Sequence, residues 1–184
     1  MDFTEKTMKS DRIFEGKVIN LRVDTVELPN GGTSTREVVE HPGGVGVIPV
    51  NENREVLMVR QFRKPVDDVC LEIPAGKLNY GEDPYTCGVR ELEEETGFKA
   101  KNIQSLGNFY TTPGFTNEVI HIYMATELYK GEVKLDEDEF VEVEAIPLDT
   151  LMDMVMRGEI RDAKSIIAIL KVNELLKNSG GTVK

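Results

Sequence analysis

The sequence of 184 residues has little of what membrane, secreted and nucleic-acid-binding proteins need. No stretch approaches the roughly eighteen apolar residues of a membrane span, and residues 1–6 lack the basic start and apolar run of a secretory signal. Basic residues are outnumbered, with 22 Lys and Arg against 33 Asp and Glu and a net charge of -11. Nonspecific nucleic-acid binding needs a basic surface to displace counterions. We therefore expect neither a membrane nor a nucleic acid as partner.

Cysteine and histidine are also scarce. The two cysteines, Cys70 and Cys87, allow one disulfide at most, and each lies in an apolar or helical context typical of a buried free thiol. A reducing cytoplasm is the expected compartment. His41 precedes Pro-Gly-Gly and His121 lies in a strand-like run, so neither has further metal-ligating residues at the spacing of a metal site. Zinc chemistry is not indicated.

One segment is instead rich in acid, and its flanking residues predict a helix over 84–96. Asp83 is a good N-cap, Pro84 suits the first helical position, and Gly97 is placed for a left-handed C-terminal cap. Four residues recur at helical spacing and predict a stripe that faces the core: Tyr85, Val89, Leu92 and Thr96.

Three glutamates of this helix are expected to share one face. At about 100° per residue, Glu91 and Glu95 lie roughly 40° apart on one flank of the stripe, and Glu94 lies roughly 60° beyond Glu91. Glu93 projects to the other side of Leu92. Like charges at this spacing cost a helix a few tenths of a kcal/mol per pair, so a compensating cation is expected. Mg²⁺ takes oxygen ligands and usually binds one or two carboxylates together with substrate phosphates.

Taken alone, the acidic run is equally consistent with a solvated helix face. The residues around it favour the metal site. Their spacing resembles the Nudix box at every defined position: Gly76, five residues, Glu82, seven residues, Arg90-Glu91-Leu92, one residue, Glu94-Glu95, one residue, Gly97-Phe98.

The resemblance implies a role for each acid of the box. Glu91 and Glu95 would be the principal metal ligands, Glu94 a further ligand or a supporting acid, and the carbonyl of Ala75 another oxygen ligand. The implied cofactor is Mg²⁺, with Mn²⁺ as the alternative. Arg90 would orient these acids through a salt bridge, for which Glu82 is the expected partner.

Strand-like runs surround the box. Residues 13–28 and 33–39, joined by a turn at 29–32, predict a hairpin ahead of the catalytic core. Six further strands are predicted at 45–50, 56–60, 70–73, 103–110, 118–125 and 140–147, and two further helices at 149–157 and 162–177. This order resembles the α/β class of the Nudix family, an α/β/α sandwich with a mixed sheet and an N-terminal antiparallel β extension. Residues 1–44 would form the extension and residues 45–184 the hydrolase domain.

Outside the box, the chain resembles the ADP-ribose pyrophosphatase group over nearly its full length. The resemblance lies in residues 40–43, 60–65, 72–77, 112–118, 135–140 and 161–164. Pro113, sixteen residues beyond Gly97, falls where that group carries a diagnostic proline.

Several residues of these segments are candidates for binding substrate. Guanidinium groups suit a diphosphate because they offer forked hydrogen bonds, which favours Arg36 and Arg63, although a surface salt bridge is the alternative for either. The aromatic residues Phe62, Tyr110 and Phe115 are candidates either for stacking on adenine or for the core. The resemblance adds four more candidates to the substrate site: Glu72, Pro113, Gly114 and Glu118.

Residues 136–139 form a second acidic run. Its composition predicts a solvated loop. In the family that the chain resembles, a loop at this place closes over the substrate. The resemblance implies Glu137 as the catalytic base and Glu139 as an additional metal ligand, with the two roles exchangeable.

The implied activity is Mg²⁺-dependent hydrolysis of the diphosphate bond of ADP-ribose to AMP and ribose 5-phosphate. One alternative changes the substrate to NADH, a dinucleoside polyphosphate or another nucleotide sugar. A second alternative is a noncatalytic module that binds ADP-ribose as a regulator. Similar enzymes exchange their N-terminal strands across a two-fold axis, so the resemblance also implies a homodimer that acts on a small nucleoside diphosphate sugar.

Overall fold

The computed structural model of the chain describes residues 2–135 and 140–178. It divides into two compact units. The first comprises Met1–Gly43 and Tyr110–Val119, and the second comprises Gly44–Phe109 and Ile120–Lys184. The segment Tyr110–Val119 therefore clusters with the N-terminal strands, although it comes after the Nudix box in the sequence.

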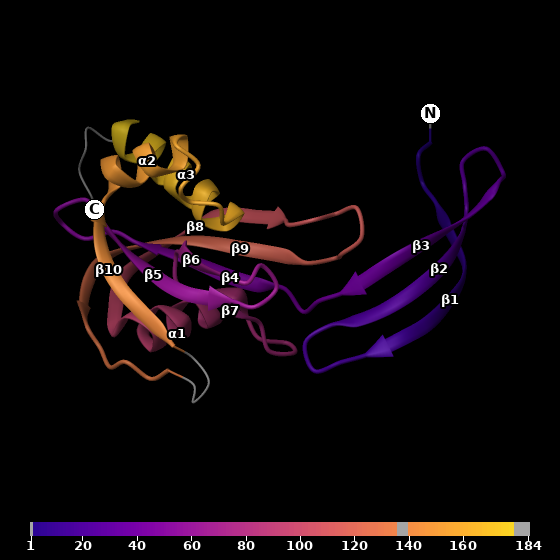
Figure 1. Ribbon diagram of the computed structural model, residues 1–184, viewed down its shortest axis with the longest axis horizontal. Helices are drawn as coiled ribbons and strands as arrows, with labels where there is room; N and C mark the ends of the chain where they lie inside the picture. The colour runs from indigo at the N-terminus through magenta and orange to yellow at the C-terminus, as the bar shows by residue number, and fades with distance from the viewer. Residues whose placement is uncertain (1, 136–139, 179–184) are drawn as a thin grey trace. The chain divides into compact units, whose positions relative to one another are not determined.

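The first unit is built on a three-stranded antiparallel sheet in the order β1-β2-β3 (Figure 1). Its strands are β1 (Lys6–Glu15), β2 (Asn20–Glu27) and β3 (Thr33–Glu40). The predicted hairpin corresponds to β2 and β3. The expectation of one strand over 13–28 was wrong, because the chain turns at Gly16, whose N–H donates to the carbonyl of Ile19 at 3.0 Å. Strand β1 is exposed along its whole length, and its few apolar residues do not alternate with polar ones, so the sequence carries no period-two signal for it.

The second unit contains two sheets. A four-stranded sheet has the order β7-β4-β9-β8, in which β4 runs parallel to β9 and antiparallel to β7, as expected of a mixed sheet. A three-stranded antiparallel sheet has the order β10-β5-β6. The strands are β4 (Gly44–Pro49), β5 (Glu55–Arg63), β6 (Asp68–Glu72), β7 (Ala75–Lys77), β8 (Phe98–Tyr110), β9 (Val119–Lys130) and β10 (Val141–Pro147). The short β7 was not predicted, because three residues carry no periodicity.

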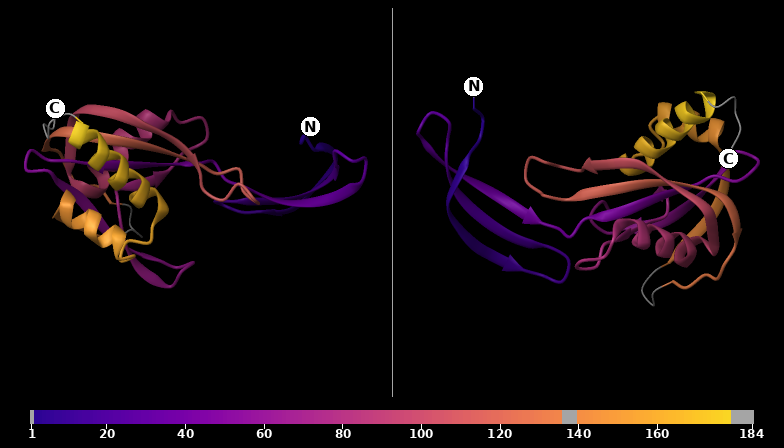
Figure 2. Two further views of the ribbon diagram at one scale, coloured as in Figure 1. Left: turned by 90° about the horizontal axis from the view of Figure 1, so that it is seen from above. Right: turned by 180° about the vertical axis from the view of Figure 1, so that it is seen from behind.

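In the part of the chain that the structure describes, the helices that cover these sheets are α1 (Pro84–Thr96), α2 (Leu148–Met156) and α3 (Ala163–Asn178). Figure 1 shows α2 and α3 on one side of the strands and α1 on the other, and the view from behind in Figure 2 agrees. One apolar core packs α2 and α3 against the strands, and a second, smaller core packs α1. The α/β/α sandwich predicted from the sequence is confirmed. Within residues 2–135 and 140–178, no helix has the length and apolar character to cross a membrane.

Both cysteines are free thiols, as predicted. Cys87 lies on the buried face of α1, and this burial raises the pKa of its thiol to about 12. Cys70 is only half-buried, so the expectation of a buried thiol was wrong there.

Helix α1 has the predicted bounds and caps but not the predicted buried face. The Asp83 carboxylate accepts from the N–H of Thr86 at 2.9 Å, and Gly97 takes a left-handed φ of 71°. Leu92 is buried, whereas Tyr85 and Val89 are 48% and 36% exposed. The expected stripe was therefore wrong at two of its four positions.

The face that α1 does bury runs through Gly88, Glu91, Leu92 and Glu95. A Cβ added to Gly88 would lie 3.1 Å from a methyl of Val45 and 3.3 Å from a methyl of Val47. The missing side chain thus lets α1 rest closely on β4. Because Glu91 and Glu95 follow Gly88 at three and seven residues, this approach turns both carboxylates inward.

We expect Gly88→Leu to lower the free energy of unfolding by about 1–3 kcal/mol, because the added side chain overpacks the contact between α1 and β4. Urea denaturation measures this change. Val89→Leu, one residue away on the exposed face, serves as the control and should stay within about 0.5 kcal/mol of wild type. Equal stability of the two variants would contradict close packing of α1 on β4 at Gly88.

Candidate active site

Two buried carboxylates lie against the backbone that leads into the Nudix helix. Glu91 is 7% exposed and Glu95 is 3% exposed. The N–H of Ala75 donates to Glu95 Oε2 at 3.0 Å. A Cβ added to Gly76 would lie 1.8 Å from Glu91 Oε1, so a side chain there would occupy the place of the carboxylate. Gly76 is thus required by contact with Glu91.

Arg90 joins three acids of the box through one guanidinium group. Its Nε lies 3.2 Å from Glu82 Oε1, and its Nη1 lies 2.8 Å from Glu91 Oε1 and 2.7 Å from Glu94 Oε2. Burial alone would lower the pKa of Arg90, but hydrogen bonds to Glu82 and Glu94 and the charge of Glu91 raise that pKa above its ordinary value. Arg90 therefore forms the ion pair with Glu82 that the resemblance implied, and it also offsets part of the repulsion among the acids.

Glu82 has a second partner besides Arg90, and Glu93 has partners away from Arg90. Glu82 accepts from the N–H of Asn79 at 2.9 Å, and this hydrogen bond lowers the pKa of its carboxyl group. Glu93 pairs with Lys99 at 3.2 Å and accepts from the N–H of Glu132. Glu93 is therefore directed to Lys99, as expected from its position on the other side of Leu92.

The oxygen atoms at this place suit a hard divalent cation. The glutamates on the inward side of α1, together with backbone oxygens of residues 74–77, form a set of oxygen donors without sulfur or imidazole, which Mg²⁺ prefers. The glycine at 76 leaves the room in which Glu91 lies. Among residues 2–135 and 140–178, no group of three or more His, Cys, Asp or Glu side chains is already assembled as a metal centre. Instead, Glu91 and Glu94 contact Arg90.

A second polar cluster in the same unit contains Arg63 and Glu72. Arg63 donates from Nε to Glu72 Oε1 at 2.8 Å and from Nη2 to Glu72 Oε2 at 2.9 Å, and Lys164 also donates to Glu72 Oε2. Burial would raise the pKa of Glu72, which is 2% exposed, but its hydrogen bonds and ion pairs with Arg63 and Lys164 lower that pKa to about 2. Glu72 therefore stays ionised at neutral pH and orients Arg63.

Lys164 was missed as a site residue. The sequence shows only that 161–164 is one of the segments that resemble the ADP-ribose pyrophosphatase group, and nothing in its spacing indicates a contact with Glu72, which lies 92 residues earlier in the chain.

The other substrate-binding candidates belong to the first unit. Arg36 pairs with Glu5 and donates to Ser34 Oγ at 3.0 Å, so the surface ion pair considered as its alternative is present. Glu118 accepts from Thr111 Oγ1 at 2.7 Å and lies 3.2 Å from His41 Nδ1.

Pro113 and Gly114 also lie in this unit, in a turn that the N–H of Phe115 closes on the carbonyl of Thr112 at 3.2 Å. The contacts of the first unit thus place Arg36 in an ion pair with Glu5 and Glu118 in a hydrogen bond with Thr111. A common site with the acids of α1 remains a prediction.

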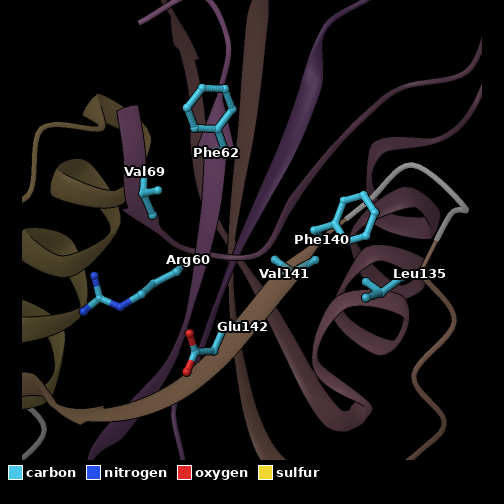
Figure 3. Close-up of a pocket in the computed structure, with 7 residues that line it drawn as sticks. All are labelled: Arg60, Phe62, Val69, Leu135, Phe140, Val141 and Glu142. Carbon is cyan, nitrogen blue, oxygen red and sulfur yellow. The ribbon is translucent and has the colours of Figure 1, made fainter. Parts of the chain in front are cut away.

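The three aromatic candidates Phe62, Tyr110 and Phe115 are all exposed, so the alternative that they belong to the core was wrong. Phe62 lines an open pocket of about 490 Å³ (Figure 3). The other lining residues come from β5, β6, β10 and the chain before and after 136–139: Arg60, Val69, Leu135, Phe140, Val141 and Glu142. Glu137 and Glu139 themselves lie outside the described residues.

Comparison with known families divides the chain at residue 40. Residues 5–39 match the nucleoside diphosphate sugar hydrolase N-terminal domain, and residues 40–168 match the NUDIX domain.

Among curated proteins, the chain is 49% identical over 177 residues to an ADP-ribose pyrophosphatase of Bacillus subtilis (strain 168), which covers 94% of this chain and 96% of that protein. It is 48% identical over 180 residues to a methanol dehydrogenase activator of Bacillus methanolicus, which covers 96% and 97%. An ADP-ribose pyrophosphatase of Mycobacterium tuberculosis is 36% identical over 173 residues, which covers 91% and 83%.

A solved structure described as an ADP compounds hydrolase superposes with a TM-score of 0.87 over 99% of this chain and 100% of that one, at 22% identity. At this identity the likeness concerns the fold. The resemblance to the Nudix box predicted from the sequence is confirmed by a match that extends over residues 40–168. On this match and on relatives that cover more than nine-tenths of its length, the chain belongs to the NUDIX family.

Proposed function

We propose that the chain hydrolyses the diphosphate bond of ADP-ribose to AMP and ribose 5-phosphate, with Mg²⁺ as cofactor and Mn²⁺ as the alternative. The observation that carries this proposal is the contact of Glu91 and Glu95 with the backbone of Gly76 and Ala75, within an intact Nudix box. Two relatives named ADP-ribose pyrophosphatase, at 49% and 36% identity, support the choice of substrate.

In this proposal the residues of α1 hold and orient the cation. Glu91 and Glu95 are its principal ligands, with Glu94 and the carbonyl of Ala75 in support. The bound cation would neutralise the diphosphate and promote ionisation of the attacking water. Arg90 keeps Glu91 and Glu94 in place through its Nη1, which contacts a carboxylate oxygen of each. Glu137 and Glu139, outside the described residues, remain the predicted base and additional ligand.

Arg63 is the residue of the second unit that we assign to the diphosphate. Its Nε and Nη2 hold Glu72, which leaves Nη1 outside that pair. The side chain is 38% exposed, so a ligand can reach it. The charge of Glu95 also acts on Arg63 and helps to raise its pKa, after the larger effect of the hydrogen bond with Glu72. This coupling supports a shared role for Arg63 and the acids of α1.

The relatives alone do not single out one substrate. Two proteins of nearly equal identity bear different names, and a GDP-mannose pyrophosphatase of Yersinia enterocolitica is 33% identical over 165 residues. Pro113 favours ADP-ribose within this set. The noncatalytic alternative is disfavoured because the box keeps its four acids, Glu82, Glu91, Glu94 and Glu95. Arg90 contacts the first three, and the N–H of Ala75 donates to the fourth.

We further propose a homodimer that forms through the N-terminal β extension, residues 1–44. The proposed compartment is the reducing cytoplasm that the two free thiols favour. Strand β1 is exposed along its whole length. Four large apolar side chains in or beside it are exposed: Phe3, Met8, Ile13 and Phe14. Several exposed apolar side chains on one segment make it a candidate surface for binding another protein, and a second copy of the chain would cover them. Arg36 and Glu118 of one copy would then be available to the substrate site of its partner.

A substrate screen tests the proposed activity. ADP-ribose, NADH, a dinucleoside polyphosphate and GDP-mannose are incubated at equal concentration with Mg²⁺, and phosphate that a phosphatase can release from the products is measured. We expect ADP-ribose to give the highest rate and EDTA to abolish it. A higher rate with another compound would replace ADP-ribose as the substrate, and hydrolysis that survives EDTA would refute the metal site.

Substitution of Glu95 by Gln tests the metal ligands. We expect kcat for ADP-ribose to fall by about 100-fold or more, since even supporting residues of metal sites cost 10–100-fold. Substrate binding, measured by calorimetry, should persist. Glu93→Gln on the same helix is the matched control, because Glu93 pairs with Lys99 instead, and it should stay within about threefold. Activity of Glu95→Gln within a few fold of wild type would contradict the assignment of Glu95 as a metal ligand.

Light scattering at micromolar concentration tests the dimer. We expect twice the mass of one chain for wild type. Ile13→Asp should shift the distribution toward the monomer, because it places a charge on the apolar surface of β1. A monomeric wild-type protein would contradict the dimer without affecting the proposed chemistry of α1.

A further inference from the structure

A chain of polar contacts joins the start of α3 to the strand that leads into the Nudix loop. The N–H of Ile73 donates to Ser165 Oγ at 2.8 Å, and both the N–H and the hydroxyl of Ser165 donate to Asp162 Oδ2. The other oxygen of Asp162 lies 3.0 Å from Lys164 Nζ. Lys164 in turn donates to Glu72, which holds Arg63.

These contacts lie in the interior. Ile73 and Ser165 are fully buried, and the side chain of Lys164 is 14% exposed. Ile73 packs closely on β4, since a Cβ added to Gly46 would lie 2.8 Å from Cδ1 of Ile73, and the stem of Lys164 lies beside it, 3.7 Å from the same point. A lysine that is largely shielded from solvent between two carboxylates is costly to leave unpaired, so its geometry is strongly determined.

These contacts meet the backbone at Ile73, between a residue that orients Arg63 and a residue that binds Glu95. Ile73 and Pro74 connect β6 of one sheet to β7 of the other, and the carbonyl of Pro74 accepts from the N–H of Val47 at 2.8 Å. Immediately after Pro74, the N–H of Ala75 donates a hydrogen bond to the carboxylate of Glu95. Immediately before Ile73, the carboxylate of Glu72 accepts a hydrogen bond from Arg63.

We infer that Asp162, Lys164 and Ser165 are positioning residues for hydrolysis. Lys164 fixes the carboxylate of Glu72 and thereby the direction of Arg63 toward the diphosphate. Ser165 fixes Ile73 and thereby the backbone of Ala75 and Gly76, on which the metal-binding glutamates rest. This inference rests on the proposed function for the roles of Arg63 and the acids. Helix α3 would thus position two parts of the site at once: Arg63, through Glu72, and the glutamates of α1, through the backbone of Ala75 and Gly76.

A purely structural role would have a different signature. If the contacts served only to attach α3, their loss would lower the free energy of unfolding and leave KM unchanged at temperatures where the protein is folded. If Lys164 acts through Arg63, its loss raises KM, and the increase disappears when Arg63 is already absent. A double-mutant cycle separates these two cases.

The test begins with the wild-type substrate screen, and all variants are then measured with the compound that wild type hydrolyses fastest. We expect Lys164→Gln to raise KM about tenfold, in the range found for supporting residues, with kcat within threefold. In an Arg63→Gln background the same change should raise KM less than twofold. Lys177→Gln, which removes an exposed lysine from the last turn of the same helix, is the control and should match wild type.

Asp162→Asn provides a second variant that keeps an oxygen acceptor for Ser165 but loses the charge beside Lys164, and it should raise KM in the same direction. Ser165→Ala should weaken binding of Mn²⁺ to the substrate-free protein about fivefold or more by electron paramagnetic resonance, relative to the exposed Ser105→Ala. A KM of Lys164→Gln equal to that of Lys177→Gln, or the same increase in both Arg63 backgrounds, would overturn the inference. Failure of ADP-ribose in the screen would overturn only the proposed substrate.

Discussion

The contact of two buried carboxylates with the backbone at Ala75 and Gly76 is the interaction on which the rest of the site depends. Burying Glu91 and Glu95 side by side on one helix is unfavourable unless donors and cations compensate for their desolvation and repulsion. The N–H of Ala75 and the guanidinium of Arg90 supply part of this compensation. In the proposed function, a divalent cation would add to this compensation, which links the stability of this region to the proposed chemistry.

This contact also explains why two glycines lie where they do. Gly76 has no side chain because Glu91 lies where its Cβ would be, and Gly88 has none because α1 rests there on Val45 and Val47. Each glycine removes a steric obstacle between the helix and the strands. Together they bring the acidic side of α1 against the loop. The acids are therefore part of the interface between helix and sheet.

Much of the fold could be predicted from the sequence, because the signals involved are local. Asp83, Pro84 and Gly97 determined the ends of α1 through the capping of its own backbone groups. Strand β1 was missed because it is exposed on both faces and has no apolar alternation. The buried face of α1 was misjudged because an apolar stripe was expected, whereas Tyr85 is exposed and Glu95 is buried.

The sequence by itself determined that the chain is a Nudix hydrolase, because the residues of the Nudix box lie close together in the sequence. They occupy one helix and the segment before it. Only the tertiary structure decided which groups hold those residues in place. Lys164 meets Glu72 across 92 positions, and Ser165 meets Ile73 across the same separation. Such contacts depend on how α3 packs on the strands, and packing between distant segments leaves no periodicity that a single sequence could reveal.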